Sequence, residues 1–210
     1  MSEEQKRRYR CCFTGHRPEK LNCNEAAIKV KLSHAIDKAI QDGFVTFISG
    51  MARGVDIWAA ELLLECRAAT SSLHLICVLP YSGFERRWSP QWQTRYQAIL
   101  QHADLIKTIC PLYSMAAFQQ RNEWMVDHSS RLIAIYNGSP GGTRNTIEYA
   151  KRKSSKSPSM IRTMKLPAQL LKMAKVLINS CVSAPLCPKN GDKTIIAWYN
   201  TIVLICRNTQ

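Results

Sequence analysis

Short apolar runs alternate with stretches of helical apolar spacing along the first 153 residues of this 210-residue chain. The five runs are continuous and span 9–14, 44–49, 73–79, 104–110 and 131–136. Continuous apolar runs are typical of strands that are buried on both faces, as in parallel sheets. The stretches between and after them predict helices over 25–41, 54–69, 90–101, 114–129 and 143–152. This alternation predicts an α/β fold of Rossmann-like type, a three-layer sandwich with a mostly parallel central sheet.

The net charge of +14 is unevenly distributed along the chain. Residues 1–153 hold 21 Lys and Arg against 14 Asp and Glu, whereas residues 154–210 hold 8 against 1. The second segment begins with a Ser- and Lys-rich stretch that is typical of a linker. We therefore predict a folded domain over 1–153 and an irregular, basic, poorly ordered tail over 154–210, whose role the sequence leaves open. Such charge favours anionic partners, and it leaves nucleotides and nucleic acids both open.

The first ten residues carry charges of both signs and no apolar stretch, so we expect no secretory signal. The apolar run 195–206 is shorter than the roughly 20 residues that cross a bilayer, so no transmembrane segment is expected. A cytoplasmic location is therefore the default expectation.

No CxxC pair occurs among the nine cysteines, and nothing beyond the spacing of Glu123 and Asp127 points to a metal, so no metal site or cofactor is predicted. Self-association into a homo-oligomer stays open.

Four of the expected strand-to-helix turns carry glycine, arginine or both, over 14–18, 49–56, 80–84 and 137–143. In parallel sheets, ligands bind beyond the carboxyl ends of the strands, where such turns meet. Glycine lets the backbone approach a phosphate closely, and the amides of a following helix favour negative charge. Each glycine alone would be explained by a tight turn, but several such turns at one sheet edge favour a ligand pocket. The predicted ligand-binding residues are Gly15, His16, Arg17, Ser49, Gly50, Arg53, Gly54, Asp56, Gly141, Gly142 and Thr143.

The turn over 49–56 matches neither G-x-G-x-x-G nor a Walker loop, so an ordinary dinucleotide or ATP site is not supported. Asp56 falls in the first turn of the following helix. It is explained equally by a favourable interaction with the helix dipole and by a role as acceptor for a ligand hydroxyl. Trp88 follows the third turn, where packing and stacking on a base are both open.

Four groups of residues together resemble the YpsA-like proteins of the SLOG superfamily, which also holds the DprA/Smf and LOG (Lonely Guy) proteins. They are Thr14-Gly15-His16-Arg17, the stretch from Ser49 to Asp56, Arg121-Asn122-x-Trp124 with its continuation to Ser129, and Gly141-Gly142-Thr143 with Thr146 and Tyr149. The resemblance covers residues 9–153. It implies a Rossmann-like domain that binds or senses a nucleotide or a nucleotide-derived ligand, such as one related to ADP-ribose, and a link to cell division.

LOG enzymes cleave the N-glycosidic bond of nucleotides, and their motif is only partly present. Pro140-Gly141-Gly142 and Glu148 fall in register and Arg121 matches the family's arginine, so the resemblance would make Arg121 and Glu148 catalytic. Arg144, Asn145 and Asn122 replace a Gly, a Thr and a Lys of that motif. We therefore predict a ligand-binding protein, with a LOG-like phosphoribohydrolase and a DprA-like DNA-binding protein as alternatives.

Overall fold

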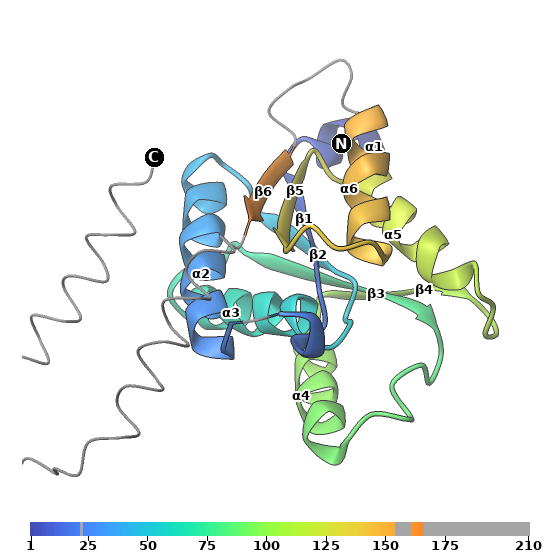
Figure 1. The fold of residues 1–210 in the computed structure, drawn as a ribbon. Helices are drawn as coiled ribbons and strands as arrows, with labels where there is room; N and C mark the ends of the chain where they lie inside the picture. The colour runs from blue at the N-terminus through green and yellow to red at the C-terminus, as the bar shows by residue number, and fades with distance from the viewer. Residues whose placement is uncertain (22, 154–160, 166–210) are drawn as a thin grey trace, which may run out of the picture. The chain divides into compact units, whose positions relative to one another are not determined.

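The computed structural model describes residues 1–21, 23–153 and 161–165, all within one compact unit, Met1–Leu171 (Figure 1). Its sheet has six strands in the order β4-β3-β2-β1-β5-β6, and every neighbouring pair is parallel. The strands are β1 (Arg10–Gly15), β2 (Thr46–Ser49), β3 (His74–Tyr81), β4 (Leu105–Cys110), β5 (Arg131–Tyr136) and β6 (Ile161–Lys165). The α/β, Rossmann-like fold class predicted from the sequence is confirmed.

Helices cover both faces of the sheet, as Figure 1 shows. They are α1 (Glu3–Arg7), α2 (Glu25–Gln41), α3 (Val55–Ala69), α4 (Pro90–Gln101), α5 (Ala117–Asp127) and α6 (Gly142–Lys153), with a short 3-10 helix at Pro18–Lys20. One apolar cluster joins α2, α3 and α4 to one face, and a second joins α5 and α6 to the other. Among the described residues, no helix combines the length and the apolar character that crossing a membrane requires.

The central strand β1 shows why its sequence is apolar without a break. Successive side chains of a strand point to opposite faces of the sheet. Cys11 and Phe13 accordingly pack in the first cluster and Cys12 in the second, and all three side chains are fully buried. A strand with a helix layer on each face has no solvent-facing side, so its sequence does not alternate.

The strand order places a topological switch beside β1. From β1 the chain proceeds through β2, β3 and β4 in one direction, whereas β5 and β6 lie on the other side. The turns that follow β1 and β5 therefore diverge, and they leave a crevice at the carboxyl ends of these two strands, where ligands of such sheets bind.

Strand β6 was not expected. The sheet continues to residue 165, into the segment that the sequence analysis assigned to an irregular tail, and Ile161 to Lys165 pair in parallel with Leu132 to Tyr136. The sequence IRTMK has only two apolar residues, Ile161 and Met164, and follows a linker-like stretch, so it lacks the continuous apolar run of the central strands. Edge strands commonly carry such polar residues. The expectations for 166–210 lie outside the described residues.

Gly54 fixes the distance between two of the turns that the sequence singled out. Its backbone has a φ of 90°, and a Cβ added there would lie 2.9 Å from the carbonyl oxygen of His16. Any side chain would therefore push the turn after β2 away from the turn after β1. Gly138 has a similar φ of 94° but no atom within 4 Å of such a Cβ.

This contrast separates backbone strain from close packing. We expect Gly138→Ala to lower the free energy of unfolding by about 1–2 kcal/mol, the cost of placing an L-residue in this region. Gly54→Ala should cost about 1–3 kcal/mol more, because the clash with the His16 carbonyl adds to the strain of a positive φ. Urea unfolding of both variants measures the difference, and equal losses would contradict the close approach.

Candidate functional site

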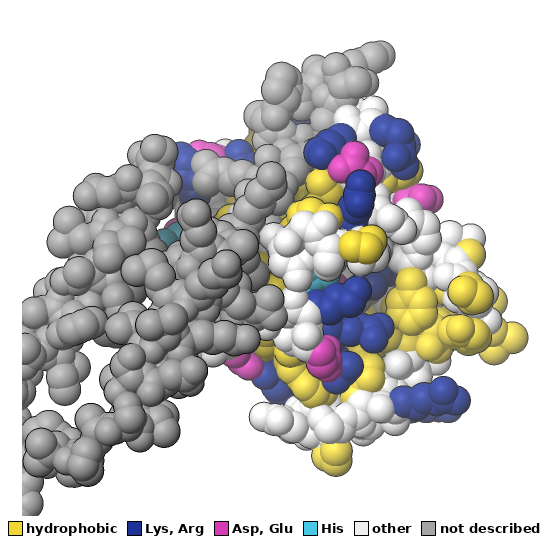
Figure 2. All heavy atoms as spheres, in the orientation of Figure 1, with side chains coloured by type: hydrophobic (Ala, Val, Ile, Leu, Met, Phe, Trp, Pro, Cys, Tyr) yellow, Lys and Arg dark blue, Asp and Glu magenta, His cyan; other side chains and the backbone are white. Residues whose placement is uncertain are grey.

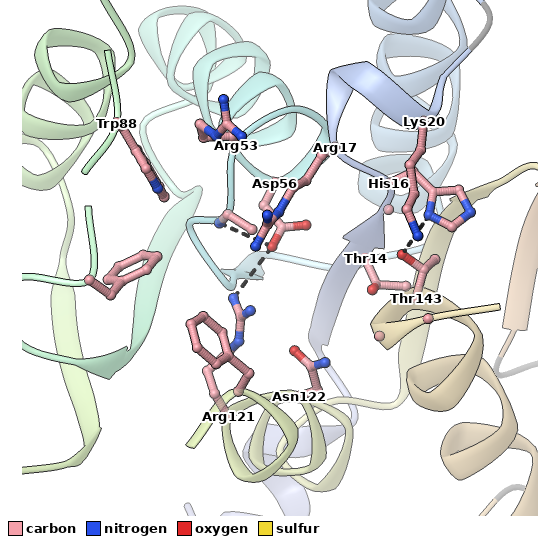
Figure 3. Close-up of a pocket in the computed structure, with 16 residues that line it drawn as sticks. Thr14, His16, Arg17, Lys20, Arg53, Asp56, Trp88, Arg121, Asn122 and Thr143 are labelled. Carbon is pink, nitrogen blue, oxygen red and sulfur yellow. Dashed lines mark hydrogen bonds and ion pairs between the residues drawn. The ribbon is translucent and has the colours of Figure 1, made fainter. Parts of the chain in front are cut away.

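A cavity of about 340 Å³ opens at the carboxyl ends of the strands, beside the switch point (Figure 3). Residues from five separate segments line it: Thr14, Gly15, His16, Arg17, Lys20, Ala52, Arg53, Asp56, Phe84, Trp88, Phe118, Arg121, Asn122, Gly141, Gly142 and Thr143. Three of the four turns that the sequence predicted to converge, 14–18, 49–56 and 137–143, contribute to the polar part of the cavity. The remaining turn, 80–84, contributes the aromatic residue Phe84.

The turn after β1 forms one wall. A Cβ on Gly15 would collide with the side chain of Val55, so glycine lets the start of α3 pack against the end of β1. His16 is buried, and its Nδ1 lies 3.4 Å from the Oγ1 of Thr143. Burial and the nearby Lys20 ammonium lower the pKa of His16, so its imidazole is neutral at pH 7. A neutral imidazole keeps one nitrogen as a hydrogen-bond acceptor and the other as a donor.

The start of α6 forms the opposite side of this part of the cavity. Gly141 precedes the helix with a φ of 143°, and Gly142 and Thr143 begin it. The first amides of an α-helix have no partner within the helix, and they carry the positive end of its dipole. Lys20 lies alongside, where its Nζ donates to the carbonyl of Pro140 at 3.4 Å. This end of the cavity therefore combines backbone N–H groups with an ammonium.

The floor holds a buried ion pair. The guanidinium of Arg121, on α5, donates from Nη1 to the carbonyl of Gly50 and lies 3.5 Å from the Oδ2 of Asp56. Both side chains are less than a tenth exposed. A Cβ on Gly50 would collide with this guanidinium, which explains the glycine. Among the described residues, the Nε of Arg121 and the Oδ1 of Asp56 are buried without a hydrogen-bond partner.

Asp56 is held by the turn in which it lies. The Ala52 amide donates to its Oδ2 at 3.3 Å, and the Ser49 hydroxyl donates to its backbone carbonyl at 2.9 Å. Burial raises the pKa of Asp56 to about 6, although the Arg121 guanidinium and the Ala52 amide favour the ionised form. Desolvation therefore outweighs the pairing, and the carboxylate is costly to keep charged.

Three aromatic side chains form the remaining wall, and one of them, Trp88, is labelled on the left of Figure 3. Phe84 and Trp88 come from the loop between β3 and α4, and Phe118 comes from α5. The ring centroids of Phe84 and Trp88 lie 5.1 Å apart at 86°, an edge-to-face contact. The side-chain amide of Gln93 donates to the carbonyls of Arg86 and Trp88 and fixes this loop.

Two arginines stand at the mouth. Arg53 pairs with Glu19 at 2.9 Å. Arg17 is exposed, and its guanidinium makes no hydrogen bond or ion pair with any residue that the structure describes. Figure 2 shows Lys and Arg side chains gathered near the centre of the same face. No group of His, Cys, Asp and Glu side chains suited to a metal ion occurs within 1–21, 23–153 and 161–165.

The structure brings together most of the residues predicted from the sequence. Those that line the cavity are Gly15, His16, Arg17, Arg53, Asp56, Arg121, Gly141, Gly142 and Thr143. Ser49, Gly50 and Gly54 do not line it, and they shape the turn that carries Asp56 instead. Glu148 is also absent from the lining, because it lies on the surface of α6 and pairs with Lys151 at 2.9 Å. Whether any of these residues binds a ligand stays a prediction.

Several lining residues were not predicted from the sequence. Lys20 follows Arg17 by three positions, and that short spacing was the one signal for it. Asn122 was noted only as the replacement of a lysine. Phe84 lies within the third turn that was singled out, but an apolar residue after a strand gives no sign of a wall in a pocket. Phe118 lies in a helix far along the chain, so only the fold reveals its place.

The raised pKa of Asp56 predicts a pH dependence of stability. In the unfolded chain the carboxyl has its ordinary pKa of 3.8, and in the folded chain about 6. Between these values the folded protein retains a proton that the unfolded chain releases, so this contribution to stability falls as the pH rises. Compared with Asp56→Asn, the wild type should lose up to about 3 kcal/mol of unfolding free energy between about pH 4 and pH 6.

Urea unfolding of both proteins at several pH values measures this difference. Because all other groups titrate in both proteins, only the difference between the two stability curves is informative. A difference that stays constant or changes with the opposite sign would show that burial does not dominate at Asp56.

Comparison with known proteins shows which proteins this chain is similar to. A UPF0398 protein of Bacillus pumilus is 28% identical over 159 residues, which are 72% of this chain and 86% of that protein. The prophage-derived protein YoqJ of Bacillus subtilis is 31% identical over 138 residues, 60% of this chain and 81% of that protein. A UPF0398 protein of Staphylococcus aureus is 26% identical over 111 residues, 52% of this chain and 59% of that protein.

Among solved structures, the DNA processing protein A of Helicobacter pylori, described with a single-stranded DNA binding mode, shares the fold. Its TM-score is 0.51 at 16% identity, over 86% of this chain and 82% of that chain. The family model YpsA, described as the YspA SLOG family, matches residues 11–168. That range contains the glycine turns, the Arg121–Asp56 pair and the start of α6, and the resemblance inferred from the sequence is confirmed. The chain belongs to the YpsA family of SLOG proteins.

Proposed function

We propose that the cavity binds a nucleotide or a nucleotide-derived ligand, with phosphate at the start of α6 and the base against the aromatic wall. One observation carries this proposal: a single cavity has a cationic, amide-rich end and an aromatic end. A nucleotide has the same two-ended chemistry. The volume of about 340 Å³ lies within the range of roughly 300–1,000 Å³ that is usual for small-molecule sites.

The cationic end suits a phosphate. The first amides of α6 offer N–H donors at the positive end of a helix dipole, a frequent arrangement for anion binding. The Lys20 ammonium supplies a charge beside them. Arg17 and Arg53 at the mouth could hold a second phosphate in a bidentate way, which favours a diphosphate such as an ADP-ribose-like ligand.

The aromatic end suits a base. Phe84, Trp88 and Phe118 all line the cavity, and the buried Phe84 makes edge-to-face contacts with the other two rings, which are partly buried. Stacking on aromatic side chains contributes roughly 1–3 kcal/mol per base and tolerates any base. Asp56 and Arg121 lie between the two ends, as Figure 3 shows, where the sugar of a bound nucleotide would be. Of the two roles open for Asp56, this position favours acceptance of a sugar hydroxyl.

Fragments of the ligand test the two-ended site. We expect AMP, ADP or ADP-ribose to raise the Tm of the full chain more than adenosine, which lacks phosphate, or ribose 5-phosphate, which lacks a base. Lys20→Ala should weaken binding of every phosphorylated ligand by about 10- to 100-fold, through the loss of a charge-assisted contact. Trp88→Ala should weaken the binding of nucleotides by a similar factor and leave the binding of ribose 5-phosphate unchanged.

Arg8→Ala is the matched control, because Arg8 is exposed, lies outside the cavity and carries the same charge. A panel in which no nucleotide changes the Tm would refute the proposal. If Arg8→Ala and Lys20→Ala weakened the binding of phosphorylated ligands equally, that binding would be a non-specific attraction to the net charge of the protein.

The hydrolase alternative has less support. It needs a carboxylate beside the N-glycosidic bond, but Glu148 pairs with Lys151 on the surface and does not line the cavity. The second candidate catalytic residue, Arg121, is held by Gly50 and Asp56. Asp56 is the one carboxylate among the residues that line the cavity, and it already forms an ion pair with Arg121.

Binding of single-stranded DNA is the second candidate function. The structural neighbour from Helicobacter pylori is described as binding it, and the chain has a net charge of +14. If phosphates dominate, affinity for an oligonucleotide should fall steeply with salt, by roughly 0.7 log units per phosphate contact and tenfold rise in salt. Fluorescence anisotropy at several salt concentrations measures this slope. No binding at low salt would exclude this candidate.

A further inference from the structure

The outer edge of the sheet at β4 is open. Within the described residues, no strand pairs with the side of β4 that faces away from β3. Both faces of the strand are also uncovered at its start, since Leu105 is 51% and Ile106 46% exposed although they point to opposite faces. Unpaired edges of this kind recruit a further strand unless the sequence protects them.

Exposed apolar side chains concentrate beside this edge. Of the nine large hydrophobic residues that are exposed in the described part of the chain, five lie between positions 105 and 115: Leu105, Ile106, Leu112, Tyr113 and Met115. We call these five residues the β4 patch. Figure 2 shows a group of hydrophobic side chains at the right-hand side, where Figure 1 places β4 and the loop to α5.

The β4 patch is electrically neutral on a basic molecule. Residues 103–120 contain one acidic and one basic residue, Asp104 and Lys107, whereas the whole chain carries +14. Two copies of this chain repel each other through their net charge. They therefore meet with least repulsion where the surface is neutral and apolar. A strongly anionic partner would instead seek the basic face around the cavity.

We propose that a second copy of this chain docks on the β4 patch, so that the two β4 strands pair antiparallel about a twofold axis. A twofold axis places one residue opposite its own copy. An axis centred on Lys107 would place the two Lys107 ammonium groups opposite each other, which is unfavourable. Centring it on Ile106 opposes two isoleucines and places Leu105 opposite the methylene stem of Lys107.

The backbone fixes the type of pair at this axis. In β3, the amide of His74 donates to the chain just before β2, so the peptide groups of the next residue, Leu75, face β4. The parallel pairing of Ile76 with Leu105 then directs the peptide groups of Leu105 toward β3 and those of Ile106 outward. Across an axis centred on Ile106, the two isoleucines would therefore exchange both of their backbone hydrogen bonds as a hydrogen-bonded pair.

The size of the β4 patch predicts a weak dimer. Burying one large apolar side chain removes roughly 60–120 Å² of surface, so five that are about two-thirds exposed supply roughly 200–400 Å² per copy. Standard interfaces bury about 800 Å² per partner. The dimer should therefore dissociate on the order of micromolar concentrations.

Sedimentation velocity of the full chain between about 1 and 100 µM tests this proposal. We expect a concentration-dependent dimer that strengthens with salt, because salt screens the repulsion between the copies. Ile106→Lys should raise its dissociation constant at least about tenfold by opposing two charges at the axis. The matched control Val30→Lys changes an apolar residue of similar exposure, on α2, and should have no effect.

Cross-linking keeps the proposal testable if Ile106→Lys is unstable. Under oxidation, Ile106→Cys should form an intermolecular disulfide faster than Val30→Cys or the wild type, because residue 106 lies opposite its copy. A chain that stays monomeric throughout the concentration range overturns the proposal. So does a dimer that Ile106→Lys leaves intact, or one that salt dissociates, since another surface would then hold the copies together.

Discussion

Arg121 is a charged group in a place where charge is costly. Its guanidinium is almost completely buried, and it is held by the Gly50 carbonyl and the Asp56 carboxylate. An unpaired buried charge destabilises a protein strongly, so α5 and the turn after β2 cannot separate without a large loss. The cavity depends on this link, because α5 also carries Phe118 and Asn122, whereas the turn carries Ala52 and Arg53. The same pair leaves one polar atom of each side chain without a partner among the described residues.

Close backbone approach completes the site. Gly15 admits Val55, Gly50 admits the guanidinium, and Gly54 admits the carbonyl of His16. Each glycine brings two segments that are distant in sequence closer than a Cβ would allow. The turns after β1 and β2 are therefore packed on each other, on the start of α3 and on α5 by contacts within the chain itself. A preorganised site of this kind avoids the cost of ordering loops on binding.

The sequence predicted the elements that are governed by local pattern. The strand at Arg131–Tyr136 and the helices at Glu25–Gln41 and Pro90–Gln101 agree with it to the residue, because their apolar spacing is unbroken. The helix expected over 114–129 begins later, at Ala117, since residues 112–115 are exposed rather than packed on the sheet. Strand β6 was missed because an edge strand needs no continuous apolar run.

The polar half of the site was also visible in the sequence, since glycine and arginine together at several strand ends are typical of turns that bind anions. Of the aromatic half, only Trp88 was singled out, and packing and stacking on a base were both left open for it. Phe84 and Phe118 carry the same apolar character as core residues, and only their position in the fold makes them part of a wall. Glu148 matches a family motif by spacing, and the fold shows what spacing alone does not: α6 presents it to the surface, where it pairs with Lys151.

The proposed site has one end for a phosphate and one end for a base, and a crystal structure of the full chain with bound AMP tests it most directly. We expect density for the phosphate within hydrogen-bonding distance of the Gly142 and Thr143 amides and of Lys20, with the base against Trp88. A nucleotide bound elsewhere on the molecule, or in the cavity with its phosphate against the aromatic wall, would contradict it.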